Sequence, residues 1–203
     1  MSISRTATLA AVLAAALGVW QAVAAVNRSS MPIAMAALAT ASTTATAPLP
    51  QRVGDPITTS GQVPHVQKNI TPDTELLTAL TRFAFALPGV EQRRTIVSLP
   101  GAKGMWLNDS LPVARPETIV SGREFAHIHT DGSLHAPLPY ARALEMVERG
   151  WGERHPWADR RDGWDGLVMI FTPLTDAQLQ VVKQLIVESY NHVTGLSVSI
   201  SAS

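Results

Sequence analysis

The segment EFAHIHTDGSLHAPLP, residues 124–139, predicts the centre of a β-sheet. Its two halves alternate side chains as strands do, and Asp131-Gly132 between them is a frequent hairpin turn. The segment also contains three of the six histidines of the chain, so the way its strands pair decides where these imidazoles lie.

Two turns fit this hairpin. A two-residue loop of Asp131 and Gly132 sends His135 to the face opposite His127 and His129. A three-residue loop with Gly132 in the left-handed conformation pairs His127 with His135 and places all three imidazoles on one face. The sequence leaves both registers open, and only the second brings the three rings together.

The flanking segments alternate between helical and strand-like patterns. Helices are expected at 72–87, 140–149 and 176–194, and strands at 93–99, 104–108, 117–129, 133–139 and 166–173. This order favours an α+β fold, a mainly antiparallel sheet with helices packed on one face. An apolar N-terminal helix and a flexible linker are expected to precede it.

Several helix boundaries have recognisable signals. Thr71 is the expected N-cap of the first helix, and Thr175 with Gln178 forms a capping box for the last. In the middle helix, Leu144 and Val147 fall on the face expected to be buried. In the last helix, the buried face is expected to consist of Leu179, Val182, Ile186 and Val193.

The first seventy residues differ in composition from the rest. Residues 1–30 are predicted to be a signal peptide or a transmembrane anchor, because a long apolar stretch follows a single early cation. Residues 31–69 are rich in Ala, Thr and Pro and are expected to form a linker, and 70–203 the folded domain. Either N-terminal role places the domain in the cell envelope, anchored by a single membrane span or exported.

Composition excludes several functions. The formal net charge is zero, which gives no general attraction to nucleic acid. The chain has no cysteine, so disulfides, thiolate nucleophiles and thiolate zinc sites are excluded.

The histidine hairpin has three interpretations. Neutral imidazoles could hold zinc, iron or manganese. One of His127, His129 and His135 could instead take a proton from an acidic substrate while the others orient it, with Glu124 as a further catalytic candidate. The rings could also be structural, bonded to the backbone or to water.

A second cluster follows in GWGERHPWADRRDGW, residues 150–164. Its tryptophans could stack on a flat aromatic ligand whose oxyanion pairs with an arginine, or they could simply cover the core. The candidate substrate-binding residues are Trp151, Arg154, His155 and Trp157, with Trp106 as a further wall.

These motifs together resemble the luciferase domain of fungal bioluminescence enzymes and their bacterial relatives. The resemblance rests on Arg-Glu-Phe-Ala-His-Ile-His, on Leu-His after the turn, on Gly-Trp-Gly-Glu-Arg-His-Pro, and on the apolar strand that leads into the last helix, between Gly122 and Val193. The Ala/Thr-rich linker is typical of a bacterial chain.

The resemblance implies an oxygen-using enzyme. Fungal luciferase oxidises the styryl-pyrone 3-hydroxyhispidin with molecular oxygen and is thought to need no organic cofactor. The function expected here is therefore a cofactor-independent oxygenase that acts on an enolisable aromatic molecule, with a histidine as base and oxygen as co-substrate. The alternatives are an envelope module that binds an aromatic ligand without turnover, and an enzyme with a histidine-bound metal.

Overall fold

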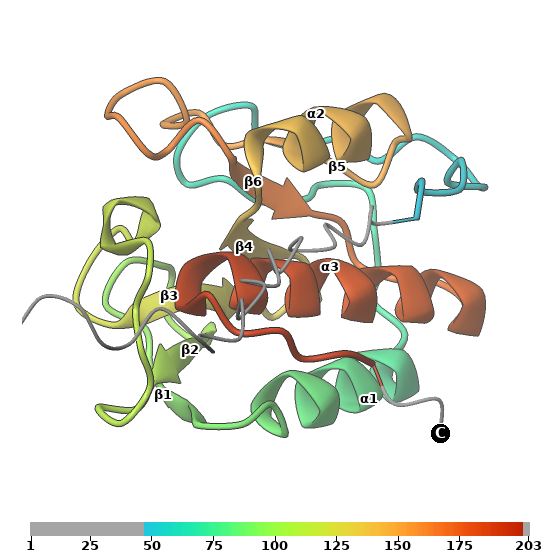
Figure 1. Ribbon diagram of the computed structural model, residues 1–203. Coiled ribbons are helices and arrows are strands. Elements are labelled where there is room, and N and C mark those ends of the chain that lie inside the picture. The colour runs from blue at the N-terminus through green and yellow to red at the C-terminus, as the bar shows by residue number, and fades with distance from the viewer. Residues whose placement is uncertain (1–46, 201–203) are drawn as a thin grey trace, which may run out of the picture. The chain divides into compact units, whose positions relative to one another are not determined.

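A computed structural model of the chain describes residues 47–200 (Figure 1). They form a six-stranded sheet in the order β1-β2-β3-β4-β6-β5, and every neighbouring pair is antiparallel. The elements are α1 (Thr74–Phe85), β1 (Val90–Arg94), β2 (Lys103–Leu107), η1 (Pro116–Thr118), β3 (Glu124–Ile128), β4 (Leu134–Pro137), α2 (Tyr140–Glu148), β5 (Gly152–Arg154), β6 (Leu167–Ile170) and α3 (Asp176–Thr194). The predicted α+β class with an antiparallel sheet is confirmed.

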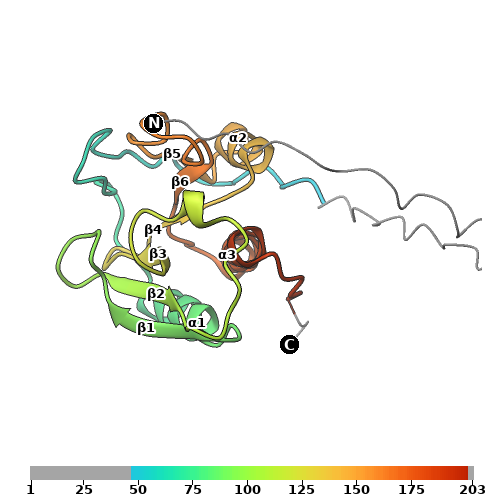
Figure 2. The same cartoon turned by 60° about the vertical axis from the view of Figure 1, so that its left-hand side comes forward.

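Helices α1 and α3 pack against each other on one side of the sheet, and α3 crosses in front of β3 and β4 (Figures 1 and 2). The residues predicted to form the apolar face of α3 are buried: Leu179, Val182, Ile186 and Val193. Tyr190 of α3 meets Phe125 of β3 edge to face, with ring centroids 6.2 Å apart. This side of the sheet is the core, and the histidines lie on the other side.

The helix caps match the prediction at α3 and differ at α1. The Thr175 hydroxyl accepts a hydrogen bond from the Gln178 backbone N–H at 3.2 Å, and Gly195 ends the helix with φ of 74°. At α1 the predicted N-cap Thr71 is wrong. The Asp73 carboxylate caps instead, because it accepts from two backbone N–H groups, those of Glu75 and Leu76, each at 2.9 Å.

Three strand predictions are corrected. The strand expected at 117–129 begins only at Glu124, and residues 116–118 form the short 3-10 helix η1. The strand expected at 93–99 begins at Val90 and ends at Arg94. Residues 152–154, expected to be a loop because of their glycines, form the edge strand β5. Gly152 is needed there because a Cβ atom on it would lie 2.0 Å from the Met169 carbonyl oxygen of β6.

We expect Gly152→Ala to lower the free energy of unfolding by about 2–3 kcal/mol, since the backbone of β5 must move away from β6. Urea unfolding followed by tryptophan fluorescence measures it. Gly61→Ala is the control: it meets no atom within 4 Å, so it reports only the cost of a side chain at positive φ. Equal losses in the two variants would refute the close-packing role of Gly152.

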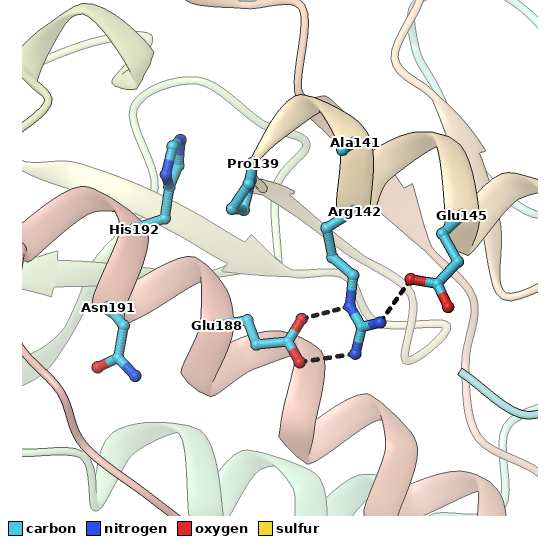
Figure 3. A pocket seen from close by; sticks show the side chains of 7 residues that line it. All are labelled: Pro139, Ala141, Arg142, Glu145, Glu188, Asn191 and His192. Carbon is cyan, nitrogen blue, oxygen red and sulfur yellow. Dashed lines mark hydrogen bonds and ion pairs between the residues drawn. The ribbon is translucent and has the colours of Figure 1, made fainter. Parts of the chain in front are cut away.

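Helix α2 is rotated relative to its predicted orientation. Leu144 and Val147, expected inside, are largely exposed, whereas Arg142 is buried. Figure 3 shows why: the Arg142 guanidinium bonds both oxygens of Glu188, at 2.7 and 2.8 Å, and Glu145 on its other side at 2.6 Å. This fork ties α2 to α3, and the apolar side chains that α2 buries beside it are Ala143 and Met146. The open hollow of about 500 Å³ beside it is thus lined by ion-paired groups.

We expect Arg142→Ala to destabilise the fold by about 3 kcal/mol, because it leaves the Glu188 carboxylate partly buried without its cation. The midpoint of urea unfolding measures this. Arg142→Met, which keeps most of the aliphatic volume, should lose nearly as much. A loss below about 0.5 kcal/mol in either variant would mean that the fork is no stronger than a surface ion pair.

The predicted linker is only partly a linker. Residues 47–69, here called the strap, lie on the domain instead of forming a free spacer up to residue 69. The Trp151 indole donates to the Pro50 carbonyl at 2.7 Å, and the Gln178 amide donates to the Val53 carbonyl at 2.8 Å. The strap has too few apolar side chains for a core of its own, but the domain supplies the partners for its polar groups.

The apolar segment predicted at 1–30, and the first part of the predicted linker, lie outside the described residues. Within residues 47–200, none of the helices has both the length and the apolar character that crossing a bilayer requires. The envelope location therefore stays a prediction from the sequence.

Candidate functional site

The hairpin adopts the three-residue turn. His127 pairs with His135, the His129 N–H donates to the Ser133 carbonyl at 2.8 Å, and Gly132 has φ of 81°. A Cβ atom at Gly132 would in addition collide with Thr172. The register that gathers three imidazoles on one face is therefore the one observed.

A β-bulge adds Glu124 to this face. The pairing shifts between Met105 and Trp106 of β2, so that Phe125 of β3 has no direct partner in β2. Strict alternation would place Glu124 and His127 on opposite faces, but the extra residue turns Glu124 to the histidine side. Its carboxylate lies 3.3 Å from His127 Nδ1 and also accepts from the Thr95 hydroxyl at 2.6 Å.

Two further histidines join the three of the hairpin. The strap supplies His65, and the segment after β5 supplies His155. Ring centroids are 5.2 Å apart between His65 and His135, 4.6 Å between His135 and His155, and 4.8 Å between His129 and His135. Four buried imidazoles thus surround His135, and we call the five rings together the histidine cluster.

A cavity of about 130 Å³ opens over the histidine cluster. Its floor consists of the imidazoles of His65, His129, His135 and His155, and its rim of Val63, Pro64, Val97, Ser98, Leu99 and Trp157. A cavity of about 150 Å³ holds benzene in another protein, so one six-membered ring is the size that fits inside. Any larger ligand must extend past the apolar rim.

Hydrogen bonds fix the tautomer of His129. The Ser133 hydroxyl lies 2.7 Å from the Asp131 carboxylate and must donate to it, because a carboxylate only accepts. The serine oxygen therefore accepts from His129 Nδ1, 2.9 Å away, and Nδ1 carries the ring proton. Burial and the nearby His127 lower the pKa of His129 to about 4, so the ring is neutral at pH 7. Its Nε2 then has a free lone pair.

The opposite tautomer is fixed at His155. The backbone N–H of Trp157 donates to His155 Nδ1 at 3.0 Å, so this nitrogen accepts. Burial and the nearby His65 lower the pKa of His155 to about 4, and the neutral ring must carry its proton on Nε2. In the described part of the chain neither Nε2 has a hydrogen-bond partner. The cavity therefore presents one base and one donor.

The remaining imidazoles bond to one another. His127 Nε2 lies 3.1 Å from His135 Nδ1, and His135 Nε2 lies 3.2 Å from His65 Nδ1. His65 Nε2 bonds Glu153, whose carboxylate also accepts from the Thr59 hydroxyl at 2.5 Å. Burial, with smaller contributions from the neighbouring imidazoles, lowers the pKa of His135 well below its usual value. At Glu124, burial taken alone raises the pKa of the carboxyl group. The hydrogen bonds that the carboxylate accepts together lower it by more, so the pKa is lowered.

Two triads have the spacing of metal ligands, with one nitrogen per ring within 4.8 Å of the others: His127, His129 and His135, and His65, His135 and His155. Zinc and non-haem iron accept such nitrogens. In the second triad, however, His155 Nε2 carries a proton and has no lone pair to give. In the first, His127 Nε2 and His135 Nδ1 already bond to each other.

Of the other predicted site residues, some line the cavity and some do not. Trp157 lines the cavity, where its ring meets His155 edge to face at 5.5 Å. Trp151 does not: it is buried in the core, bonded to the strap. Arg154 faces Asp159, with contacts of 2.6 and 3.1 Å, and Trp106 lies beside Glu124 at the far end of the cluster. The tryptophan-rich segment therefore contributes only Trp157 and His155 to the cavity.

Two residues of the candidate site, His65 and Glu153, were not predicted from the sequence. His65 lies in the segment expected to be a linker, and Glu153 in a stretch expected to be a loop. A signal existed for His65, because it stands between Val63-Pro64 and Val66, an apolar group within an otherwise polar segment.

Comparisons with known proteins identify a family and several relatives. A family model described as Luciferase domain matches residues 122–189. The luciferases of Armillaria ostoyae and Armillaria mellea are each 31% identical over 167 residues, which cover 72% of this chain and 61% of theirs. The luciferase of Neonothopanus nambi is 29% identical over 139 residues, 65% of this chain and 47% of its own.

The chain spans about three fifths of the length of the Armillaria luciferases, at 61%. No solved structure matches it. The matched region contains β3, the turn and β4, β5 and β6, and most of α3, and so all of the histidine cluster except His65. This chain therefore carries a domain of the fungal-luciferase-like family.

Proposed function

We propose that this domain uses molecular oxygen to oxidise an enolisable aromatic small molecule, with a hydroxypyrone or polyphenol as the substrate class. The relationship to luciferases supports the oxygen chemistry. The observation that carries the proposal is the pair of opposed tautomers in the cavity, a lone pair on His129 and a donor on His155. An enol next to a carbonyl needs one of each.

The chemistry starts with proton transfer. The His129 Nε2 lone pair takes the enol proton, and the His155 Nε2–H donates to the oxygen on which negative charge develops. The resulting enolate is electron-rich and reacts with oxygen without an organic cofactor. The apolar rim with Trp157 holds the rest of the substrate and limits access of water.

An oxygen electrode tests this proposal. Purified protein is incubated with 3-hydroxyhispidin and with smaller hydroxypyrones, and uptake of oxygen and any light are recorded. We expect uptake with at least one hydroxypyrone. Folded protein that quenches its tryptophan fluorescence with these compounds but consumes no oxygen would instead be a binding module, and the proposal would be wrong.

We expect activity to survive removal of metal ions, because the proposed proton transfer uses only the lone pair of His129 and the N–H of His155. Protein produced without a histidine tag is dialysed against a strong chelator, and its metal content and oxygen uptake are compared before and after. Stoichiometric metal in the untreated protein, absent from His127→Ala, together with loss of activity on chelation, would establish a metal enzyme in place of the proposed one.

A further inference from the structure

Three imidazoles of the histidine cluster have the spacing of ligands to a single metal ion. His127, His129 and His135, here called the hairpin triad, each place one ring nitrogen within 4.8 Å of the other two, and all three rings are buried. Their ring centroids are between 4.8 and 5.2 Å apart. Rings that share one zinc ion have centroids about 5 Å apart, because each bonding nitrogen lies about 2 Å from the metal. The arrangement of the rings therefore fits one shared ion.

Hydrogen bonds leave a lone pair on two of these rings. The Ser133 hydroxyl accepts from His129 Nδ1, so the lone pair of this ring is on Nε2. A second series of bonds acts on His135. The Glu153 carboxylate only accepts, so a neutral His65 donates to it from Nε2 and accepts from His135 Nε2 through Nδ1. His135 Nδ1 therefore has the lone pair.

The third ring needs only to move its proton from one nitrogen to the other. His127 Nε2 lies 3.1 Å from His135 Nδ1 and donates to its lone pair. Two nitrogens that bind one tetrahedral zinc ion are about 3.3 Å apart, so an ion fits in place of this proton. The proton then belongs on His127 Nδ1, which faces the Glu124 carboxylate at 3.3 Å. Each ring of the hairpin triad thus has one nitrogen for the ion and an acceptor for the N–H of the other, as histidines that bind metal usually have.

The charge around the hairpin triad also favours a cation. The carboxylates of Glu124 and Glu153 lie against imidazoles of the cluster, and that of Asp131 accepts from the Ser133 hydroxyl. Within residues 47–200, no lysine or arginine lies within ion-pair distance of any of these three carboxylates. Three carboxylates beside neutral rings give a net negative site, and a divalent ion offsets most of that charge.

We infer that the hairpin triad is a zinc site, and that zinc bound there holds the domain in a form that cannot start its reaction. The ion takes the lone pair of His129, the base of the proposed function, so this second half of the inference rests on that function. His129 and His135 also line the cavity, so a water molecule from the cavity can fill the fourth position that three imidazoles leave open. The domain is then active without zinc and inhibited with it.

The first experiment measures zinc binding without any substrate. Full-length protein without a histidine tag is freed of metal with a chelator and titrated with Co²⁺, whose visible absorption reports tetrahedral coordination, and then with Zn²⁺, which displaces it. We expect one ion per chain. His129→Asn should weaken zinc binding at least about 100-fold, because the amide keeps the bond to Ser133 but offers no lone pair at the position of Nε2. His192→Asn, the same change outside the cluster, should bind zinc as the wild type does.

Two further variants separate the hairpin triad from the other possible one. His155→Gln removes a ring that only the other triad contains, and His127→Gln removes one that only the hairpin triad contains. We expect zinc binding to survive the first change and to be lost in the second, with folding checked by circular dichroism. The reverse pattern, or a wild type that binds no zinc at micromolar concentration, would overturn the site. If His127→Gln does not fold, His129→Asn decides, because its turn stays bonded.

The second experiment measures the inhibition by oxygen uptake. Metal-free protein is assayed with a hydroxypyrone in large excess over zinc, so that zinc bound by the substrate does not deplete it. At free zinc about ten times its dissociation constant, we expect uptake to fall to about one tenth and to return when a chelator is added. Mg²⁺, which prefers oxygen ligands, is the control ion and should have no effect. Uptake that zinc leaves unchanged or raises would overturn the inhibition.

Failure here is distinguishable from failure of the proposed function, because the zinc titration needs neither oxygen nor substrate. A protein that binds zinc at the hairpin triad but oxidises no hydroxypyrone would refute the oxygenase and support the zinc site. A protein that oxidises a hydroxypyrone but binds no zinc would do the reverse.

Discussion

His129→Asn should lower kcat by about 10²–10⁴-fold and leave substrate affinity within a few-fold of the wild type. The asparagine amide can replace Nδ1–H in the bond to Ser133, so the turn keeps its structure, but no lone pair remains at the position of Nε2. The donor on His155 and the apolar rim still hold the ligand. Oxygen-uptake kinetics measure kcat, and fluorescence titration under argon measures affinity.

The chain offers a matched control for this variant. His192, on α3, is the one histidine outside the cluster, and the same substitution there should leave kcat unchanged. If His129→Asn retains more than about one tenth of the wild-type kcat, a general-base role of this size is excluded and another group must take the proton.

Folding stability should fall steeply in mildly acidic solution. His129 and His155 have a pKa of about 4 in the folded protein against about 6.5 in an unfolded chain. Between these values the unfolded chain binds the extra protons, so acid favours unfolding. The stability from burying the neutral rings is complete above about pH 6.5 and is lost as the pH falls towards 4. Near pH 5, these two groups alone give a slope of about 2.5 kcal/mol per pH unit. His135, whose pKa is also lowered by burial, adds to it.

Urea unfolding at half-unit steps from pH 7.5 to 4.5 measures this slope. His155→Gln should reduce it by about one proton, or about 1.3 kcal/mol per pH unit, because one of the buried neutral rings is gone. The lowered pKa values of Glu124 and Glu145 act at more acidic pH and do not account for a slope near pH 5. A stability that is constant from pH 7 to 5 would contradict burial of neutral rings.

The parts of the fold that could be predicted are those with local causes. Helix α3 has a capping box, an apolar stripe and a terminal glycine, all within its own sequence, and its bounds were predicted. The buried face of α2 was predicted wrongly. Arg142 pairs with two carboxylates, one of them on α3, and no pattern inside α2 reveals that partner. Strand β5 was missed because a glycine such as Gly152 is typical of a turn. Only the backbone of β6 that lies against it explains the glycine as part of a strand.

The site was predictable in composition but not in its geometry. Asp131-Gly132 suits two turns, and the choice between them depends on contacts such as that of Gly132 with Thr172. Glu124 lies on the histidine side of the sheet because of a β-bulge. The alternation of side chains in the sequence does not predict this bulge. Which ring is base and which is donor depends on Ser133 and on the Trp157 N–H, and these bonds exist only after folding.

The strap has a practical consequence for anyone who shortens this protein. A fragment that begins at residue 70 would keep every strand and the four other imidazoles of the histidine cluster. It would lack Val63, Pro64 and His65, so one wall of the cavity would be missing and the remaining rings would face bulk water. Such a fragment would look well folded by circular dichroism and yet report nothing about the reaction.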